Sequence, residues 1–68
     1  MRVNFNMDEL FAILAKNVHS NNLTTLDDVI ILTYQDEGKT PELLTLLKYR
    51  KNFGHYTIGQ LKIRYKLI

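Results

Sequence analysis

The first apolar pattern predicts a helix over residues 7–19. Its apolar side chains recur at helical spacing, at Met7, Leu10, Phe11, Leu14 and Val18. Asn6 is a favourable N-cap, and the acids Asp8 and Glu9 in the first turn suit the positive end of the helix dipole. We therefore expect one face of this helix to be buried and the opposite face to be solvated.

A second helix is predicted over residues 26–37. Thr25 followed by Asp28 approximates a capping box, and Gly38 supplies a stop. One face carries Leu26, Val29, Ile30 and Thr33, while Ile31 and Leu32 extend the apolar surface around the helix. Residues 29–34 also have the composition of a buried strand, although the cap and the length favour a helix.

Thr40-Pro41-Glu42 is a strong start for a third helix, over residues 41–52. Threonine is a good N-cap, proline fits the first helical position, and an acid suits the first turn. The apolar arc of this helix is wide and comprises Leu43, Leu44, Leu46, Leu47 and Phe53. Arg50 and Lys51 fall in the last turn, where cations complement the helix dipole.

The last segment, residues 55–67, has two interpretations. As a β-hairpin with Gly59-Gln60 as a type II′ turn, it places its apolar residues on one face and its basic residues on the other. As a helix, it is capped by Thr57 and Gln60, and Ile58, Leu61, Tyr65 and Ile68 form one stripe. The hairpin explains every position, so we favour it.

These elements predict one small domain over residues 1–68, of the α+β class. It has three helices and a C-terminal β-hairpin, in an arrangement like a winged helix. The alternative is an all-α domain of four short helices that contains a helix-turn-helix. The choice between hairpin and helix over residues 56–68 stays open at this point.

Composition removes several classes of protein. The chain has 68 residues and no cysteine, which excludes disulfides and thiolate metal sites. Its longest apolar run, Leu10 to Ala15, is far too short to span a membrane. We expect a cytoplasmic protein without a membrane partner.

The charge is divided unevenly along the chain. Residues 1–42 carry three basic and seven acidic side chains, whereas residues 43–68 carry six basic and no acidic ones. Such a division suggests a polyanionic partner for the C-terminal part. The alternative is that the two halves neutralise each other across the fold.

The inventory of reactive side chains does not favour an enzyme. His19 and His55 are the only groups that titrate near neutrality, and nothing in the pattern brings them together. The adjacent acids of 27–28 and 36–37 diverge on a helix and lack the spacing of a metal loop. We expect no cofactor, no metal and no small-molecule substrate.

Two helices followed by a basic hairpin resemble, in the order of their elements, the small winged helix-turn-helix regulators. That resemblance implies a protein that binds duplex DNA and regulates transcription. Residues of the third helix would approach bases, and basic residues after them would approach phosphates. The residues expected to contact DNA are Thr45, Lys48, Tyr49, Lys51, Asn52, His55, Lys62, Arg64 and Lys66.

Tyr56-Thr57-Ile58-Gly59-Gln60-Leu61 is similar to the opening of the helix-turn-helix in MerR-type regulators. The following residues, 62–68, do not continue that pattern. The resemblance favours the helical interpretation, in which the last segment is a recognition helix.

A protein partner is the alternative to DNA. The third helix is rich in leucine, and the net charge of +2 is small for a domain that holds a polyanion. Surplus apolar side chains would suit a modulator or inhibitor that docks on a larger protein, or a homodimer. The residues concerned are Ile31, Leu32, Tyr34, Leu46 and Tyr49.

Overall fold

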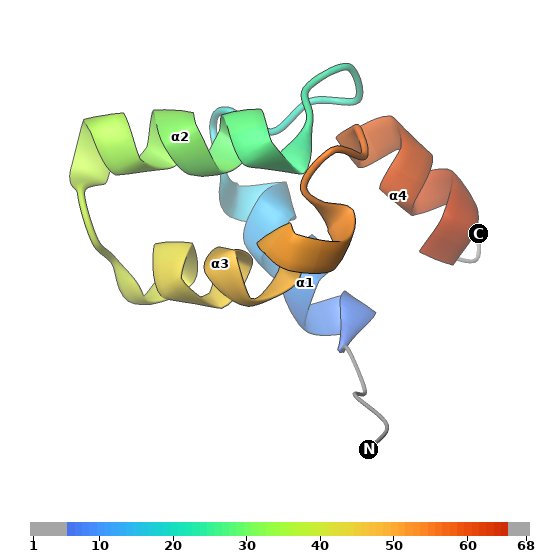
Figure 1. Cartoon of the computed structure of the whole chain (residues 1–68), viewed down its shortest axis with the longest axis horizontal. Coiled ribbons are helices and arrows are strands. Elements are labelled where there is room, and N and C mark those ends of the chain that lie inside the picture. Colours follow the sequence, from blue (N-terminus) through green and yellow to red (C-terminus); the bar gives the residue numbers. More distant parts are fainter. Residues whose placement is uncertain (1–5, 66–68) are drawn as a thin grey trace.

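The computed structural model describes residues 6–65, which form four helices and no strand (Figure 1). The helices are α1 (Met7–Lys16), α2 (Leu26–Glu37), α3 (Pro41–Phe53) and α4 (Ile58–Tyr65). The fold is therefore the all-α alternative, and the predicted α+β fold with a C-terminal β-hairpin over 55–67 is wrong.

Helix α1 begins as its sequence predicts and ends three residues earlier. The Asn6 side chain accepts a hydrogen bond from the Glu9 amide at 3.1 Å. The helix stops at Lys16 because Asn17 adopts an extended backbone, and its side chain bonds elsewhere in the fold. Val18 consequently lies outside the helix and is 88% exposed, so its predicted place in the apolar stripe is wrong.

Helices α2 and α3 lie side by side and are joined by a short loop (Figure 1). Thr25 and Thr40 act as N-caps and accept hydrogen bonds from the amides of Asp28 and Leu43. Gly38 ends α2 with a φ of 69°, a conformation that glycine adopts without strain. Residues 29–34 are helical, so the strand interpretation of this segment is wrong.

The core is formed by the apolar faces of all four helices. Its buried side chains are Leu10, Phe11, Leu14, Leu26, Val29, Ile30, Leu43, Leu46, Tyr49, Phe53, Ile58 and Leu61. On α2 the predicted face is buried, including Thr33. On α3 the predicted arc is too wide, because Leu44 and Leu47 are exposed while Tyr49 is buried.

The last segment is helical because its backbone and its capping groups are better satisfied in that form. The Thr57 hydroxyl accepts a hydrogen bond from the Gln60 amide, and the Gln60 side chain accepts one from the Thr57 amide. Ile58 and Leu61 are fully buried. A two-stranded hairpin alone is at best marginally stable, and it would leave these groups without the present partners. In the helical form the apolar Ile63 side chain is left 84% exposed to solvent.

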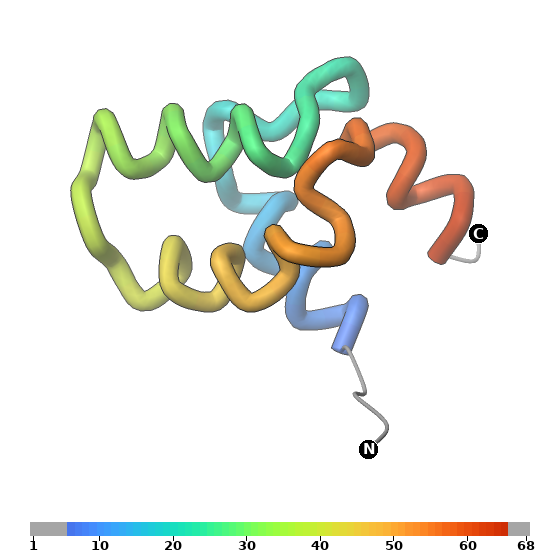
Figure 2. Tube along the Cα trace, in the orientation of Figure 1, coloured from blue at the N-terminus to red at the C-terminus, as the bar shows by residue number. Residues whose placement is uncertain are grey.

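The starts of α2 and α4 lie close together (Figure 2). Reciprocal backbone hydrogen bonds join their first turns. The amides of Leu26 and Asp27 donate to the carbonyls of Tyr56 and Gly54, at 3.0 and 2.9 Å. In return, the amides of Ile58 and Gly59 donate to Thr24 and Asn22, at 2.9 and 3.0 Å. Thr25 and Thr57 form an isolated antiparallel bridge at the centre. We call these contacts the N-terminal clasp.

Gly59 is required by this clasp and not by a turn. A Cβ atom at this position would lie 2.9 Å from the Asn22 carbonyl oxygen, closer than two such atoms normally approach. The hairpin interpretation put Gly59 in a two-residue turn, whereas the structure places it in the first turn of α4. Its small size lets the loop backbone approach the helix.

None of the helices within residues 6–65 has the length and apolar character needed to cross a membrane.

Replacing Gly59 by alanine tests whether crowding against Asn22 outweighs the higher helix propensity of alanine. Propensity alone favours alanine by about 1 kcal/mol, whereas crowding in a packed region costs roughly 1–3 kcal/mol. We expect Gly59→Ala to lower the free energy of unfolding by about 1 kcal/mol in chemical denaturation, because the crowded atom belongs to the backbone. Asn52→Ala, on the exposed side of α3, is the control and should be neutral or stabilising. A stabilised Gly59→Ala protein would contradict the close approach.

Candidate nucleic-acid interface

Several cations of the C-terminal part have no acidic partner. Within residues 6–65 the ion pairs are His19–Asp36, Lys48–Glu9 and Arg50–Asp27. Lys51, Lys62 and Arg64 are exposed and take part in none of them. The neutralisation of one half of the chain by the other is therefore incomplete in the described part of the protein.

Helix α4 places two of these cations in different surroundings. Lys62 donates a hydrogen bond to the Asn22 side chain at 3.2 Å, next to the loop before α2. The Arg64 guanidinium lies 5.5 Å from the ring centroid of Tyr56. The hairpin interpretation predicted that Lys62 and Arg64 share one basic face. This prediction is wrong because the segment is helical, and residues two apart on a helix point about 200° apart. Lys66 lies outside the described residues.

On α3 the predicted contact residues are in part already engaged. The Thr45 hydroxyl donates to the Pro41 carbonyl at 3.1 Å. Lys48 lies 3.4 Å from the Glu9 carboxylate, in an exposed ion pair of the kind that contributes little to stability. Lys51 and Asn52 are exposed at the end of the helix. Of these four side chains, the last two are the more available to a ligand.

Tyr49, predicted to approach bases, is buried and only 1% exposed. Its hydroxyl oxygen lies 2.9 Å from both the Asn6 carbonyl oxygen and a Glu9 carboxylate oxygen. Burial, followed by the neighbouring Glu9 carboxylate, raises the pKa of the Tyr49 hydroxyl. This side chain fixes α3 to the start of α1 and does not belong to the surface.

Aromatic and basic side chains meet at the turn between α3 and α4. The rings of His55 and Tyr56 are stacked, with centroids 5.3 Å apart and planes inclined by 20°. Arg64 adds its guanidinium next to Tyr56, and the buried Phe53 ring lies 6.2 Å from Tyr56. We call His55, Tyr56 and Arg64 the stacked array. Tyr56 was not among the predicted site residues, and the hairpin interpretation placed it within a strand.

The first turns of α2 and α4 do not offer their leading amides to an anion. The N-terminal clasp and the threonine caps use the first three amides of each helix. A phosphate group is commonly bound at such a terminus only when these amides are unsatisfied. Side chains must therefore supply any anion contact at this end of the protein.

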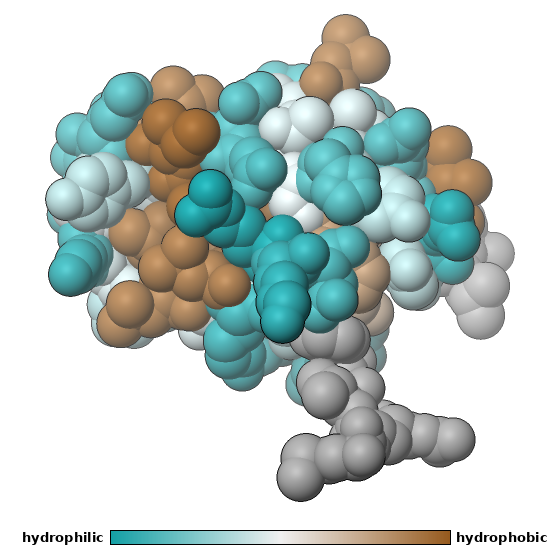
Figure 3. Space-filling view, viewed as in Figure 1, coloured by the Kyte–Doolittle hydropathy of each residue, from teal (hydrophilic) through white to brown (hydrophobic). Residues whose placement is uncertain are grey.

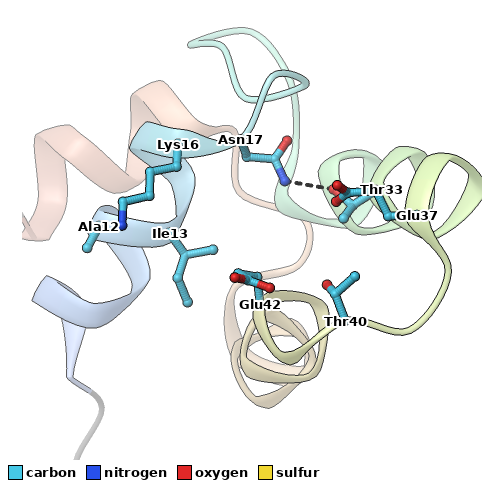
Figure 4. A pocket seen from close by; sticks show the side chains of 8 residues that line it. All are labelled: Ala12, Ile13, Lys16, Asn17, Thr33, Glu37, Thr40 and Glu42. Carbon is cyan, nitrogen blue, oxygen red and sulfur yellow. Dashed lines mark hydrogen bonds between the residues drawn. The ribbon is translucent and has the colours of Figure 1, made fainter.

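A groove of about 360 Å³ lies between α1, the end of α2 and the start of α3 (Figure 4). Its polar groups serve largely structural roles. The Asn17 amide donates to the Thr33 hydroxyl at 2.7 Å, and Thr40 caps α3. Lys16, Glu37 and Glu42 also line it, and none of them was predicted as a site residue.

Neither of the two histidines joins a catalytic or metal-binding constellation in the described residues. His19 contacts the Asp36 carboxylate at the end of α2, whereas His55 belongs to the stacked array at the turn between α3 and α4. Across residues 6–65, no three histidine, cysteine or acidic side chains converge on a position suited to a metal ion.

Comparisons with protein-family models, curated proteins and solved structures found no match in any of the three.

Changing Tyr49 to phenylalanine tests its structural role. The variant loses a part-buried hydrogen bond, so we expect the free energy of unfolding to fall by about 1–2 kcal/mol at pH 7. Because the pKa is raised in the folded state, the Tyr49 contribution is present below the ordinary tyrosine pKa. It disappears as the pH rises through the folded value.

Denaturation followed between pH 8 and pH 11 should therefore show a steeper alkaline loss of stability in the native protein than in Tyr49→Phe. Tyr34→Phe, at a side chain that is 55% exposed, is the matched control and should change neither quantity. Parallel alkaline profiles for native protein and Tyr49→Phe would contradict the assignment.

Proposed function

We propose that this protein is a small, non-enzymatic DNA-binding regulator that contacts phosphates through its C-terminal part. The observation that carries the proposal is that three cations in the described C-terminal part, Lys51, Lys62 and Arg64, have no acidic partner among residues 6–65. A polyanion would neutralise all three and release counterions, which favours binding.

The arrangement of α3 and α4 supports this proposal. Four residues separate Phe53 from Ile58, so the two helices meet through a short turn that contains Gly54. Helix-turn-helix proteins join their two DNA-binding helices in a similarly short turn, and the second helix enters the major groove. Here the second helix is α4, and its exposed side chains include Gln60, Ile63 and Arg64.

The contact residues divide into two groups in this proposal. Lys51 and His55 lie at the end of α3 and in the turn, where they would meet the phosphate backbone. Lys62 and Arg64 flank α4 on two sides and would meet the backbone on either side of the helix. Arg50 contributes less, because Asp27 neutralises it at 3.1 Å.

The salt dependence of binding to duplex DNA tests this proposal. We expect the logarithm of the binding constant to fall linearly with the logarithm of salt concentration. Each single change of Lys51, Lys62 or Arg64 to alanine should flatten this slope by about one unit, because the variant loses one phosphate contact. Lys39→Ala, in the loop between α2 and α3, is the control and should leave the slope unchanged. Undetectable or salt-insensitive binding would overturn the proposal.

A protein partner is the second candidate, favoured by an exposed apolar face on α2 and α3. The Asp27–Arg50 ion pair lies on one side of α2 and α3. Ile31 and Leu47 lie on the same side, about one helical turn from Asp27 and Arg50 respectively. The face comprises Ile31 (50% exposed), Tyr34 (55%), Leu44 (54%) and Leu47 (41%). Apolar side chains gather over α2 and α3 in Figure 3. Contiguous exposed apolar surface often marks an interaction site.

Affinity capture tests this second candidate with a matched pair of variants. The double variant Ile31→Ser, Leu47→Ser should no longer retain a stoichiometric protein partner, because both side chains lie on the apolar face. Val18→Ser with Leu23→Ser changes two side chains that are 88% and 89% exposed elsewhere, and it should retain the partner. Recovery of nuclease-sensitive material alone, identified by mass spectrometry, would count against this function.

A further inference from the structure

We infer that the stacked array is a contact site for an unpaired base of single-stranded nucleic acid. His55, Tyr56 and Arg64 bring two aromatic rings and a guanidinium together at the turn between α3 and α4. This inference rests on the proposed binding of nucleic acid and adds that an unpaired base is recognised as well as phosphate.

Within the stacked array, Tyr56 packs against the core, whereas the His55 and Arg64 side chains are exposed. The buried Phe53 ring packs 6.2 Å from Tyr56 and 5.4 Å from Tyr65, and it anchors both to the core. The Tyr56 backbone is fixed as well, because its carbonyl accepts the Leu26 amide in the N-terminal clasp. His55 and Arg64 form the exposed outer part of the array. The position of Tyr56 is therefore set by the fold before a ligand arrives.

The chemistry of the array suits a planar ligand next to a phosphate. Exposed aromatic rings and arginine planes stack on bases, and stacking tolerates any base because each has a π face. The bases of an intact duplex stack on each other and do not present their faces to a protein. The His55 side chain is exposed, and its ring stacks on Tyr56. An imidazole in this setting can add a base to the existing stack.

Charge distinguishes this array from an ordinary aromatic cluster. Arg64 has no carboxylate within 4.0 Å among the described residues, and the exposed Lys51 lies in the last turn of α3, which leads into the array. A nucleotide that stacked on His55 would carry its phosphate into surroundings with unneutralised cations. An apolar peptide would gain nothing from these charges, so a nucleic acid is the favoured occupant.

Three oligonucleotides of equal length separate base stacking from phosphate contact. They are a twelve-residue thymidine single strand, the same strand as a duplex with its adenine complement, and a twelve-residue abasic strand that keeps only sugar and phosphate. Affinities would be measured by fluorescence anisotropy in one buffer. We expect the thymidine strand to bind about five- to one-hundred-fold more tightly than the abasic strand, since one stacked base contributes that much.

His55→Ala should reduce the affinity for the thymidine strand toward that for the abasic strand. It should reduce the affinities for the duplex and for the abasic strand by a smaller factor, because there it removes a phosphate contact and no stacking. Gln35→Ala, at an exposed polar residue on α2 that has no place in the proposed interface, is the control and should leave all three affinities unchanged. In NMR spectra of the native protein, the ring protons of His55 and Tyr56 should shift upfield with the thymidine strand and not with the abasic strand.

Equal affinity for thymidine and abasic strands, without ring-proton shifts, would overturn this inference and leave salt-dependent DNA binding intact. Equal effects of His55→Ala on all three ligands would overturn it as well. Failure to bind any of the three would overturn the proposed function together with the inference.

Discussion

The reciprocal hydrogen bonds between the first turns of α2 and α4 are the constraint on which the rest of the domain depends. The first amides of a helix have no partners within the helix and must find them elsewhere. Here the residues just before each helix supply the carbonyls that the other helix needs, and a threonine cap completes each first turn. Because the four amides are paired in one reciprocal exchange, a shift of either helix would leave amides of both helices without partners. The clasp thereby fixes α4, which is short and would not be stable alone.

The surface follows from this arrangement. With α4 held against the start of α2, the turn between α3 and α4 leaves His55 exposed and Tyr56 partly buried. The same geometry brings Arg64 over Tyr56, although eight positions separate them in the chain. It also places Lys62 against Asn22, on another side of α4. The basic residues of the C-terminal part are therefore distributed around a helix end and do not form a single line.

Much of the fold could be predicted from the sequence, and the candidate site could be predicted only in part. The three helix starts at Asn6, Thr25 and Thr40 were recognisable because capping is local chemistry within four residues. The site was less accessible, since exposure depends on neighbours from elsewhere in the chain. Tyr49 stands between basic residues of α3, yet Asn6 and Glu9 bury its hydroxyl. Tyr56 gained its role through Phe53 and Arg64, contacts that no local pattern contains.

The sequence by itself determined the helical periodicity, the caps, and the separation of acidic from basic residues. These depend on residues close in the chain or on composition alone. Only the tertiary structure decided between helix and hairpin for the last segment, because alternating apolar and basic residues fit both. The deciding factor was the backbone of residues 22–24, which accepts the first amides of α4 and requires glycine at position 59. That backbone lies more than thirty positions away, and sequence spacing carries no record of such an approach.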